Sequence, residues 1–193
     1  MLNASETIAA ISTAVGTGGI GVIRISGPLA LEIGQKISGA KLKPRIANFH
    51  SFKDLNGSLI DQGLILFFPN PNSFTGEDVV ELQCHGGTVV TQSVLNFCLK
   101  NGASLAQPGE FTKRAYLNNK IDLAQAESVA DLINASTSEA ALSAANSLSG
   151  KFSLEINNLL KDLIHLRMYV EACLDFPEED IDFISEGNIK NKL

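Results

Sequence analysis

The sequence predicts an α+β fold, in which an N-terminal mixed β-sheet domain with helices is followed by long α-helices. Up to residue 118 the chain consists of short apolar runs separated by Gly, Pro and Asn, a pattern typical of strands joined by turns. From residue 119 onward the apolar residues recur at the spacing of amphipathic helices. We therefore expect one domain over residues 1–118 and the first part of a helical domain over residues 119–193.

Short strands and two helices are expected in the first domain. Ile23 and Ile25 alternate with polar neighbours, which indicates a half-buried strand, and Asn56-Gly57 between two apolar runs indicates a hairpin. Pro28 suits the first position of a helix that Gly39 then ends. The expected strands cover residues 8–12, 21–26, 49–55, 59–68, 79–84 and 104–107, and the second helix covers residues 88–100.

Two helical patterns follow residue 119, and each begins with a capping box. The boxes pair Asp122 with Gln125 and Ser136 with Glu139. Gly150 lies inside the second, longer pattern and costs about 1 kcal/mol relative to Ala, so we expect a break there, and Pro177 should end the helix. The apolar stripes of these helices have little chain to cover them, which suggests further chain or a partner.

Composition and charge exclude several classes of protein. The net charge is −6, of which −4 falls in residues 175–193, so the rest is nearly neutral and has no basic footprint for nucleic acid. The longest apolar run, residues 64–68, is too short to span a bilayer, and no signal or transit peptide is visible. Three scattered cysteines without a C-x-x-C pair exclude a disulfide framework. We expect a cytoplasmic protein.

Residues 16–21 satisfy the G-x-G-x-x-G pattern of dinucleotide-binding proteins, but the last glycine leads into a strand instead of a helix. A flexible glycine loop between two strands that approaches a ligand closely is the better interpretation. The sequence contains no G-x-x-x-x-G-K-[ST] phosphate loop. These 193 residues therefore show no recognisable site for a nucleoside triphosphate.

Cys84 and His85 are adjacent, which raises the possibility of a thiolate–imidazole pair or a metal site. Successive strand residues point to opposite faces, and no other His or Cys stands at a ligand spacing, so neither interpretation is favoured. Residues 85–87 are better explained as a strand-to-helix turn. Its free backbone N–H groups are able to receive a polar or anionic ligand group, although a Gly-Gly turn that only reverses the chain fits equally well.

Glu81 is the most informative charged residue, because it lies inside an apolar strand. A carboxylate there needs paired donors, such as an amino-pyrimidinone edge of a ligand or a guanidinium. Arg24, also within a strand, is an equally good structural partner, so a binding role and a salt bridge both stay open. Glu77 and Asp78 at a predicted turn are expected to be solvated, and Lys120 by itself is an ordinary exposed lysine.

Several motifs together resemble the tRNA-modification GTPase family MnmE, also called TrmE. They are residues 17–27 (TGGIGVIRISG), 72–78 (NSFTGED), 81–87 ending in CHGG, 108–115 (PGEFTKRA), 117–118, 120–127 (KIDLAQAE) and 176–183 (FPEEDIDF). The resemblance covers essentially the whole chain. It implies an N-terminal folate-binding and dimerisation domain with the fold of the tetrahydrofolate domain of aminomethyltransferases, followed by the opening of a helical domain.

The resemblance also implies a site. In that family an Arg, a Glu and a Lys line the folate pocket, and the matching residues are Arg24, Glu81 and Lys120. The implied ligand is 5-formyltetrahydrofolate or 5,10-methylenetetrahydrofolate, the one-carbon source for an aminomethyl-type modification of the tRNA wobble uridine. No catalytic residue and no metal ligand is assigned within residues 1–193.

The resemblance further implies a homodimer, a flavin-containing partner (MnmG, or GidA) and tRNA bound by the full complex, with no membrane. GTP, Mg and K are expected only in a GTPase domain beyond residue 193, so this chain alone is expected to be non-catalytic although the whole protein hydrolyses GTP. Two alternatives stay open, a free-standing folate-dependent one-carbon transferase and a dimerisation scaffold. The transferase would need an acid or base from among Glu77, Asp78 and His85.

Overall fold

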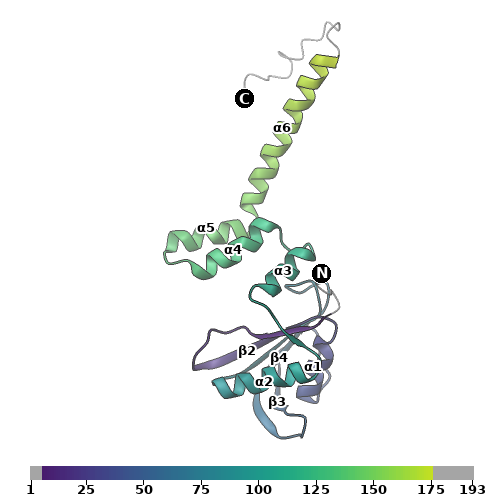
Figure 1. The fold of residues 1–193 in the computed structure, drawn as a ribbon, viewed down its shortest axis with the longest axis vertical. Helices are drawn as coiled ribbons and strands as arrows, with labels where there is room; N and C mark the ends of the chain where they lie inside the picture. Colours follow the sequence, from purple (N-terminus) through teal and green to yellow (C-terminus); the bar gives the residue numbers. More distant parts are fainter. Residues whose placement is uncertain (1–5, 176–193) are drawn as a thin grey trace. The chain divides into compact units, whose positions relative to one another are not determined.

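A six-stranded mixed β-sheet forms the centre of the N-terminal part of the chain in a computed structural model, which describes residues 6–175 (Figure 1). The chain divides into two units, of which the first ends at Ile121 and the second begins at Asp122. The strands are β1 (Ile8–Ile11), β2 (Gly18–Ser26), β3 (Asn48–Lys53), β4 (Leu59–Phe68), β5 (Val79–Gly86) and β6 (Ser104–Leu105). The helices are α1 (Ala30–Ser38), α2 (Thr88–Lys100), α3 (Glu110–Leu117), α4 (Leu123–Asn134), α5 (Ser138–Leu148) and α6 (Lys151–Asp175). The predicted α+β class is confirmed.

The strand order in the sheet is β3-β4-β5-β2-β1-β6. The β1–β6 pair is parallel, and the other pairs are antiparallel. The central pair, β2 with β5, places Arg24 directly opposite Glu81. Two residues from strands that are far apart in the sequence are thereby fixed as cross-strand neighbours.

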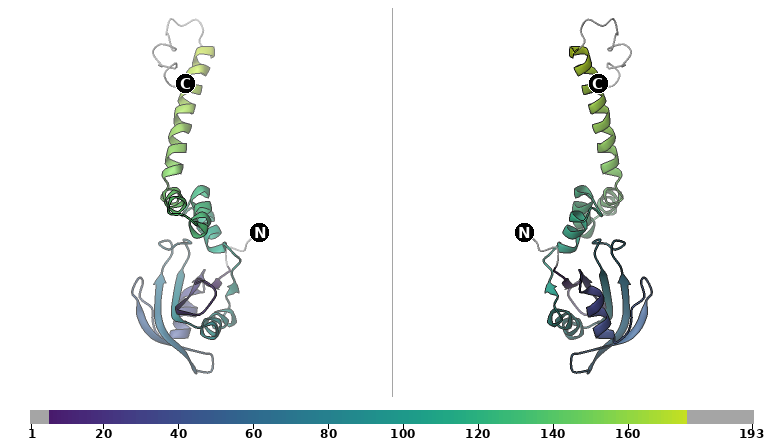
Figure 2. Two further views of the ribbon diagram at one scale, coloured as in Figure 1. Left: turned by 90° about the vertical axis from the view of Figure 1, so that its left-hand side faces the viewer. Right: turned by 90° about the vertical axis from the view of Figure 1, so that its right-hand side faces the viewer.

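Helices α1 and α2 lie on the same side of the sheet (Figure 2), and the hydrophobic core fills the space between them and the strands. Successive side chains of a strand point to opposite faces of the sheet, so every second side chain enters this core. The core side chains from β2, β4 and β5 are Ile23, Ile25, Ile65, Phe67, Val80, Leu82 and Cys84. The intervening side chains, among them Arg24 and Glu81, lie on the opposite face, which neither helix covers. We call this second face the open face.

Several predicted elements shift at their ends, and one was missed. Strand β2 begins at Gly18, so only the first two residues of the glycine segment 16–21 lie outside it, and β5 runs on through His85 to Gly86. Helix α1 begins at Ala30 instead of Pro28 and ends at Ser38, with Gly39 as its C-cap, as predicted. Helix α3 was not expected because Pro108-Gly109 resembles a loop and the helix has only eight residues.

The second unit confirms most of the helical expectations. Asp122 caps α4 through the predicted capping box with Gln125. The cap of α5 is Thr137, whose hydroxyl accepts the Ala140 N–H, so the prediction of Ser136 was wrong by one residue. Gly150, at a φ of 84°, separates α5 from α6 where a break was expected. The predicted helix end at Pro177, the acidic C-terminal residues and the motif at 176–183 lie outside the described residues.

Helix α6 exposes large apolar side chains around much of its circumference. They are Phe152, Leu154, Ile156, Leu159, Leu160, Leu163, Ile164, Met168, Val170 and Leu174. A helix with this distribution is normally covered by neighbouring helices. Over the described residues, no helix is both long and apolar enough to cross a membrane.

The close approach of β4 to β5 gives the first testable prediction. A Cβ at Gly63 would lie 1.9 Å from the Gln83 carbonyl oxygen. This oxygen belongs to the backbone, so it cannot move away by a side-chain rotation. We expect Gly63→Ala to lower the free energy of unfolding by about 3 kcal/mol, measured by urea denaturation. Gly19→Ala is the matched control, because its added Cβ meets nothing within 4 Å, and it should cost less than about 1 kcal/mol. Equal losses in the two variants would contradict the prediction.

Candidate functional site

An ion pair between Arg24 of β2 and Glu81 of β5 lies at the middle of the open face. Arg24 Nε and Nη2 donate to the same carboxylate oxygen, Glu81 Oε1, at 2.9 and 2.7 Å. The two side chains are 30% and 18% exposed, so the pair is reachable from solvent. Among the described residues, Glu81 Oε2 and Arg24 Nη1 have no hydrogen-bond partner. The pair therefore retains one carboxylate oxygen and one guanidinium nitrogen without a partner in the described part of the chain, both available to a ligand.

Two aromatic rings flank the Arg24 guanidinium. Phe74 belongs to the segment that joins β4 to β5, and Phe111 belongs to α3. Each ring centroid lies 5.8 Å from Arg24 Cζ, within the range of a cation–π contact. Phe74 is 41% exposed, and Phe111 is half-buried. The guanidinium is thus held by Glu81 along one edge and by two rings from separate parts of the chain.

A buried ionic network centred on Arg114 joins the same two segments. Arg114 Nη2 lies 3.0 Å from Glu110 Oε1 on α3, and Nη1 lies 3.1 Å from Glu77 Oε2. Nη1 also donates to the Glu6 carbonyl oxygen at 2.8 Å, and the Ser26 hydroxyl donates to Glu77 Oε2 at 2.7 Å. The Arg114 side chain is only 8% exposed. We call these five residues the Arg114 network; the expectation that Glu77 is solvated was wrong.

Lys120 is exposed and lies against the segment that carries Phe74. Its Nζ donates to the Pro71 carbonyl oxygen at 3.0 Å, and its methylenes lie close to Gly76. Asn118 anchors the same segment, because its side-chain amide donates to the Thr75 carbonyl oxygen at 2.7 Å. The structure therefore brings Arg24 together with Glu81. Among the described residues Lys120 forms no hydrogen bond or ion pair with Arg24 or Glu81, and its contacts are with the segment over residues 69–78 and with the end of α3.

His85 forms a separate pair with Asp61, away from Cys84. His85 Nδ1 lies 2.8 Å from Asp61 Oδ1, and the His85 backbone N–H donates to Asp61 Oδ2 at 2.7 Å. Burial raises the pKa of Asp61, but the hydrogen bonds from His85 and the Gln62 backbone, together with the charge of His85, outweigh it and leave the pKa below its ordinary value. The His85 ring is 74% exposed, whereas Cys84 faces the core as the alternation predicts.

The Cys84 thiol lies in surroundings that disfavour its ionised form. Burial, together with the charge of Asp61, raises the pKa of the Cys84 thiol to about 11, so the thiol stays protonated at neutral pH. No group of three or more His, Cys, Asp or Glu that could hold a metal ion occurs in residues 6–175 as the structure describes them. The arrangement therefore gives no support to thiolate chemistry.

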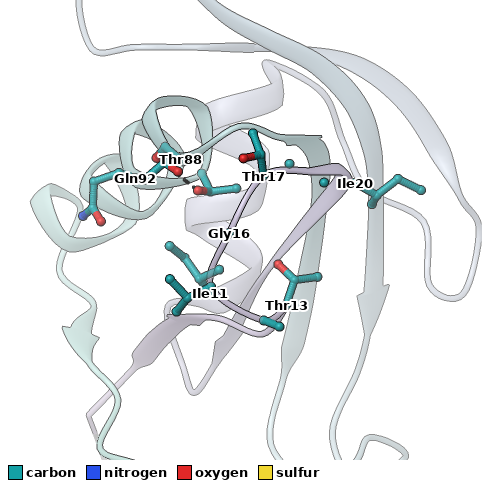
Figure 3. Close-up of a pocket in the computed structure, with 12 residues that line it drawn as sticks. Ile11, Thr13, Gly16, Thr17, Ile20, Thr88 and Gln92 are labelled. Carbon is teal, nitrogen blue, oxygen red and sulfur yellow. Dashed lines mark hydrogen bonds between the residues drawn. The ribbon is translucent and has the colours of Figure 1, made fainter.

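The glycine segment borders a cavity of about 510 Å³ at the end of β2 remote from Ser26. Figure 3 shows Thr13 and Thr17 of the β1–β2 connection beside it, with Thr88 and Gln92 of α2 on the other side. Its lining contains no charged side chain. The last glycine of the pattern lies inside β2, not at the start of a helix, so the dinucleotide interpretation lacks its structural context.

Phe74, Phe111 and Arg114 were missed by the sequence reasoning. Glu110 and Arg114 are four residues apart with opposite charges, the spacing of an ion pair on a helix. This spacing indicates an ion pair only when the segment is known to be helical, and helix α3 was not predicted. Nothing local indicated that the two phenylalanines lie beside Arg24, because those contacts join distant parts of the chain.

The chain matches two family descriptions. Residues 7–120 match "GTP-binding protein TrmE N-terminus", and residues 123–193 match "MnmE helical domain". Three curated relatives carry the name tRNA modification GTPase MnmE. The protein from Saccharophagus degradans is 58% identical over 189 residues, covering 98% of this chain and 41% of the relative. The protein from Pseudomonas putida (strain W619) is 56% identical over 188 residues, covering 97% of this chain and 41% of the relative. The protein from Pseudomonas paraeruginosa (strain DSM 24068 / PA7) is 57% identical over 193 residues, covering 100% of this chain and 42% of the relative. The chain thus spans about two fifths of the length of these relatives.

The geometry of the Arg24–Glu81 pair predicts a small contribution to stability. Partly exposed cross-strand ion pairs contribute little, because solvent screens them. In a double-mutant cycle of Arg24→Met and Glu81→Leu, read by urea denaturation, we expect a coupling energy of about 1 kcal/mol or less. A coupling energy above about 3 kcal/mol would identify a structural ion pair and would contradict a pair kept available for a ligand.

Proposed function

Because the chain belongs to the MnmE (TrmE) family of tRNA modification GTPases, we propose that it binds a tetrahydrofolate one-carbon donor through Arg24, Glu81 and Lys120. Residues 1–118 would form the folate-binding and dimerisation domain, and residues 119–193 the first part of the helical domain. The observation that carries the proposal is the Arg24–Glu81 pair on the open face, with an unpaired oxygen on one side chain and an unpaired nitrogen on the other.

The residues of the site fit the chemistry of a folate. Its amino-pyrimidinone edge presents N–H donors beside a carbonyl acceptor, which match Glu81 Oε2 and Arg24 Nη1. The ammonium of Lys120 suits the carboxylates of the glutamate tail. When bound, 5-formyl- or 5,10-methylenetetrahydrofolate supplies the one-carbon unit. The role of this chain is to bind and orient that ligand.

The relatives' printed name supports a place for this chain in a tRNA modification GTPase. We place GTP hydrolysis, with its Mg and K, in the part of the relatives that this chain does not cover. Modification of the wobble uridine, with tRNA and the flavin-containing MnmG as partners, would likewise need the whole protein.

A free-standing folate-dependent transferase is the less favoured alternative. It needs an acid or base beside the bound ligand. Glu77 is paired with Arg114, His85 with Asp61, and the Asp78 carboxylate accepts the Asn70 N–H. In the part of the chain that the structure describes, these three candidates are therefore engaged in other contacts.

A homodimer is supported by apolar side chains on the same side of the sheet as the ion pair. Phe49 and Leu64 are exposed there, and together with Ile20 they border a shallow apolar groove. A second copy would cover this groove and exclude water from the neighbouring ion pair. Burial of Phe49 would then strengthen the dimer through removal of its apolar surface from water.

Calorimetric titration with 5-formyltetrahydrofolate tests the proposed ligand. We expect the unmodified chain to bind it, and Glu81→Gln to weaken binding about 10- to 100-fold, because the variant loses a charge-assisted hydrogen bond. Glu32→Gln is the control, since Glu32 lies on α1 in an exposed pair with Lys36 and should leave affinity unchanged. Absence of binding by the unmodified chain, or equal affinities in all three proteins, would refute the proposal.

Light scattering tests the dimer. The unmodified chain should show twice its monomer mass of 20.6 kDa, and Phe49→Ser should shift the equilibrium toward the monomer. Val89→Ser on α2 removes an apolar side chain that is exposed elsewhere, at 80% against 65% for Phe49, and should leave the mass unchanged. A strictly monomeric unmodified chain at high concentration would contradict the proposed dimer.

A further inference from the structure

Two segments that are distant in the sequence meet at Arg24. Phe74 lies in the connection between β4 and β5, and Phe111 lies on α3, and each contributes one ring beside the guanidinium. Neither segment belongs to the sheet, so hydrogen bonds of the strands do not fix their positions. Something else must hold the two rings at the same distance from Arg24.

Arg114 is the residue that connects these segments. Its guanidinium contacts Glu110 on its own helix, Glu77 in the connection between β4 and β5, and the Glu6 carbonyl oxygen before β1. A planar guanidinium with several donors satisfies acceptors in fixed directions, which a lysine ammonium does not reproduce. Because the side chain is buried, these hydrogen bonds are shielded from water.

The Arg114 network also reaches the strand of the ion pair. Ser26 lies two positions after Arg24 on β2, on the same side of the strand, and its hydroxyl donates to Glu77. Without the guanidinium of Arg114, Glu77 and Glu110, whose side chains are 17% and 7% exposed, would lose the fork of donors that joins them. The connection and α3 would then separate, and Phe74 and Phe111 would move with them.

We propose that Arg114 is the positioning residue of the site, because through Glu77 and Glu110 it determines where Phe74 and Phe111 lie. These two rings in turn hold the Arg24 guanidinium in the orientation that presents Nη1 to the ligand. The choice of a folate as that ligand rests on the function proposed above. The proposal that Arg114 positions Arg24 does not depend on which ligand binds. Arg114 itself needs no contact with the ligand.

The side-chain N–H signals of arginine provide a direct test without ligand. The chain contains four arginines, so the Nε–H region of a proton–nitrogen NMR spectrum is simple, and the signal lost in Arg24→Lys assigns Arg24. In Arg114→Lys we expect the Arg24 signal to shift and its hydrogen exchange to accelerate. Lys113→Gln, an exposed position on the same helix, should leave the Arg24 signal unchanged.

The same variants are then titrated with 5-formyltetrahydrofolate. We expect Arg114→Lys to weaken binding about tenfold, the equivalent of one charge-assisted hydrogen bond, while thermal unfolding shows that the variant remains folded. An unchanged Arg24 signal in folded Arg114→Lys would overturn the proposal. If this variant does not fold, Glu77→Gln decides, with a shifted Arg24 signal supporting the proposal and an unchanged signal overturning it.

The two readouts separate the two proposals. A shifted Arg24 signal together with no folate binding by the unmodified chain would support the positioning role and refute the folate. Folate binding that is lost through Glu81→Gln but unaffected by folded Arg114→Lys, with no change at Arg24, would support the folate and refute the positioning role.

Discussion

The antiparallel pairing of β2 with β5 is the constraint on which the site depends. Its register sets Arg24 opposite Glu81, and the alternation of the strands turns both away from the core. A slip of one residue would bring the charged pair into the apolar layer beneath α1 and α2, at a large desolvation cost. The residues that fill the core, such as Ile23, Ile25 and Leu82, therefore also determine where the charges lie.

The helices cover one face of the sheet, and this asymmetry leaves room for function on the other. On the open face, Arg24 and Glu81 satisfy each other only in part, because both hydrogen bonds go to one oxygen of Glu81. The two interpretations of Glu81 from the sequence, a salt bridge and a binding group, are compatible for this reason. The bridge uses one carboxylate oxygen and leaves the second.

Local signals in the sequence predicted several elements of the fold correctly. Asn56-Gly57 between apolar runs, Gly39 after a helix, the Asp122–Gln125 capping box and the break at Gly150 all depend on residues close together in the chain. Helix α3 was missed because it is short and follows Pro108-Gly109, and because its buried side chains, Glu110 and Arg114, are charged. Hydrophobic periodicity does not reveal a helix of this kind.

By itself, the sequence determined the class of fold, the change from strands to helices near residue 119, the family to which the chain belongs, and the candidate residues Arg24, Glu81 and Lys120. Only the tertiary structure decided that Arg24 and Glu81 are paired, that Phe74 and Phe111 lie beside them, and that Arg114 connects the two segments that carry those rings. The physical reason is range. Periodicity, caps and turns follow from interactions between neighbouring residues, whereas the contacts of the site join residues that only the sheet topology brings together.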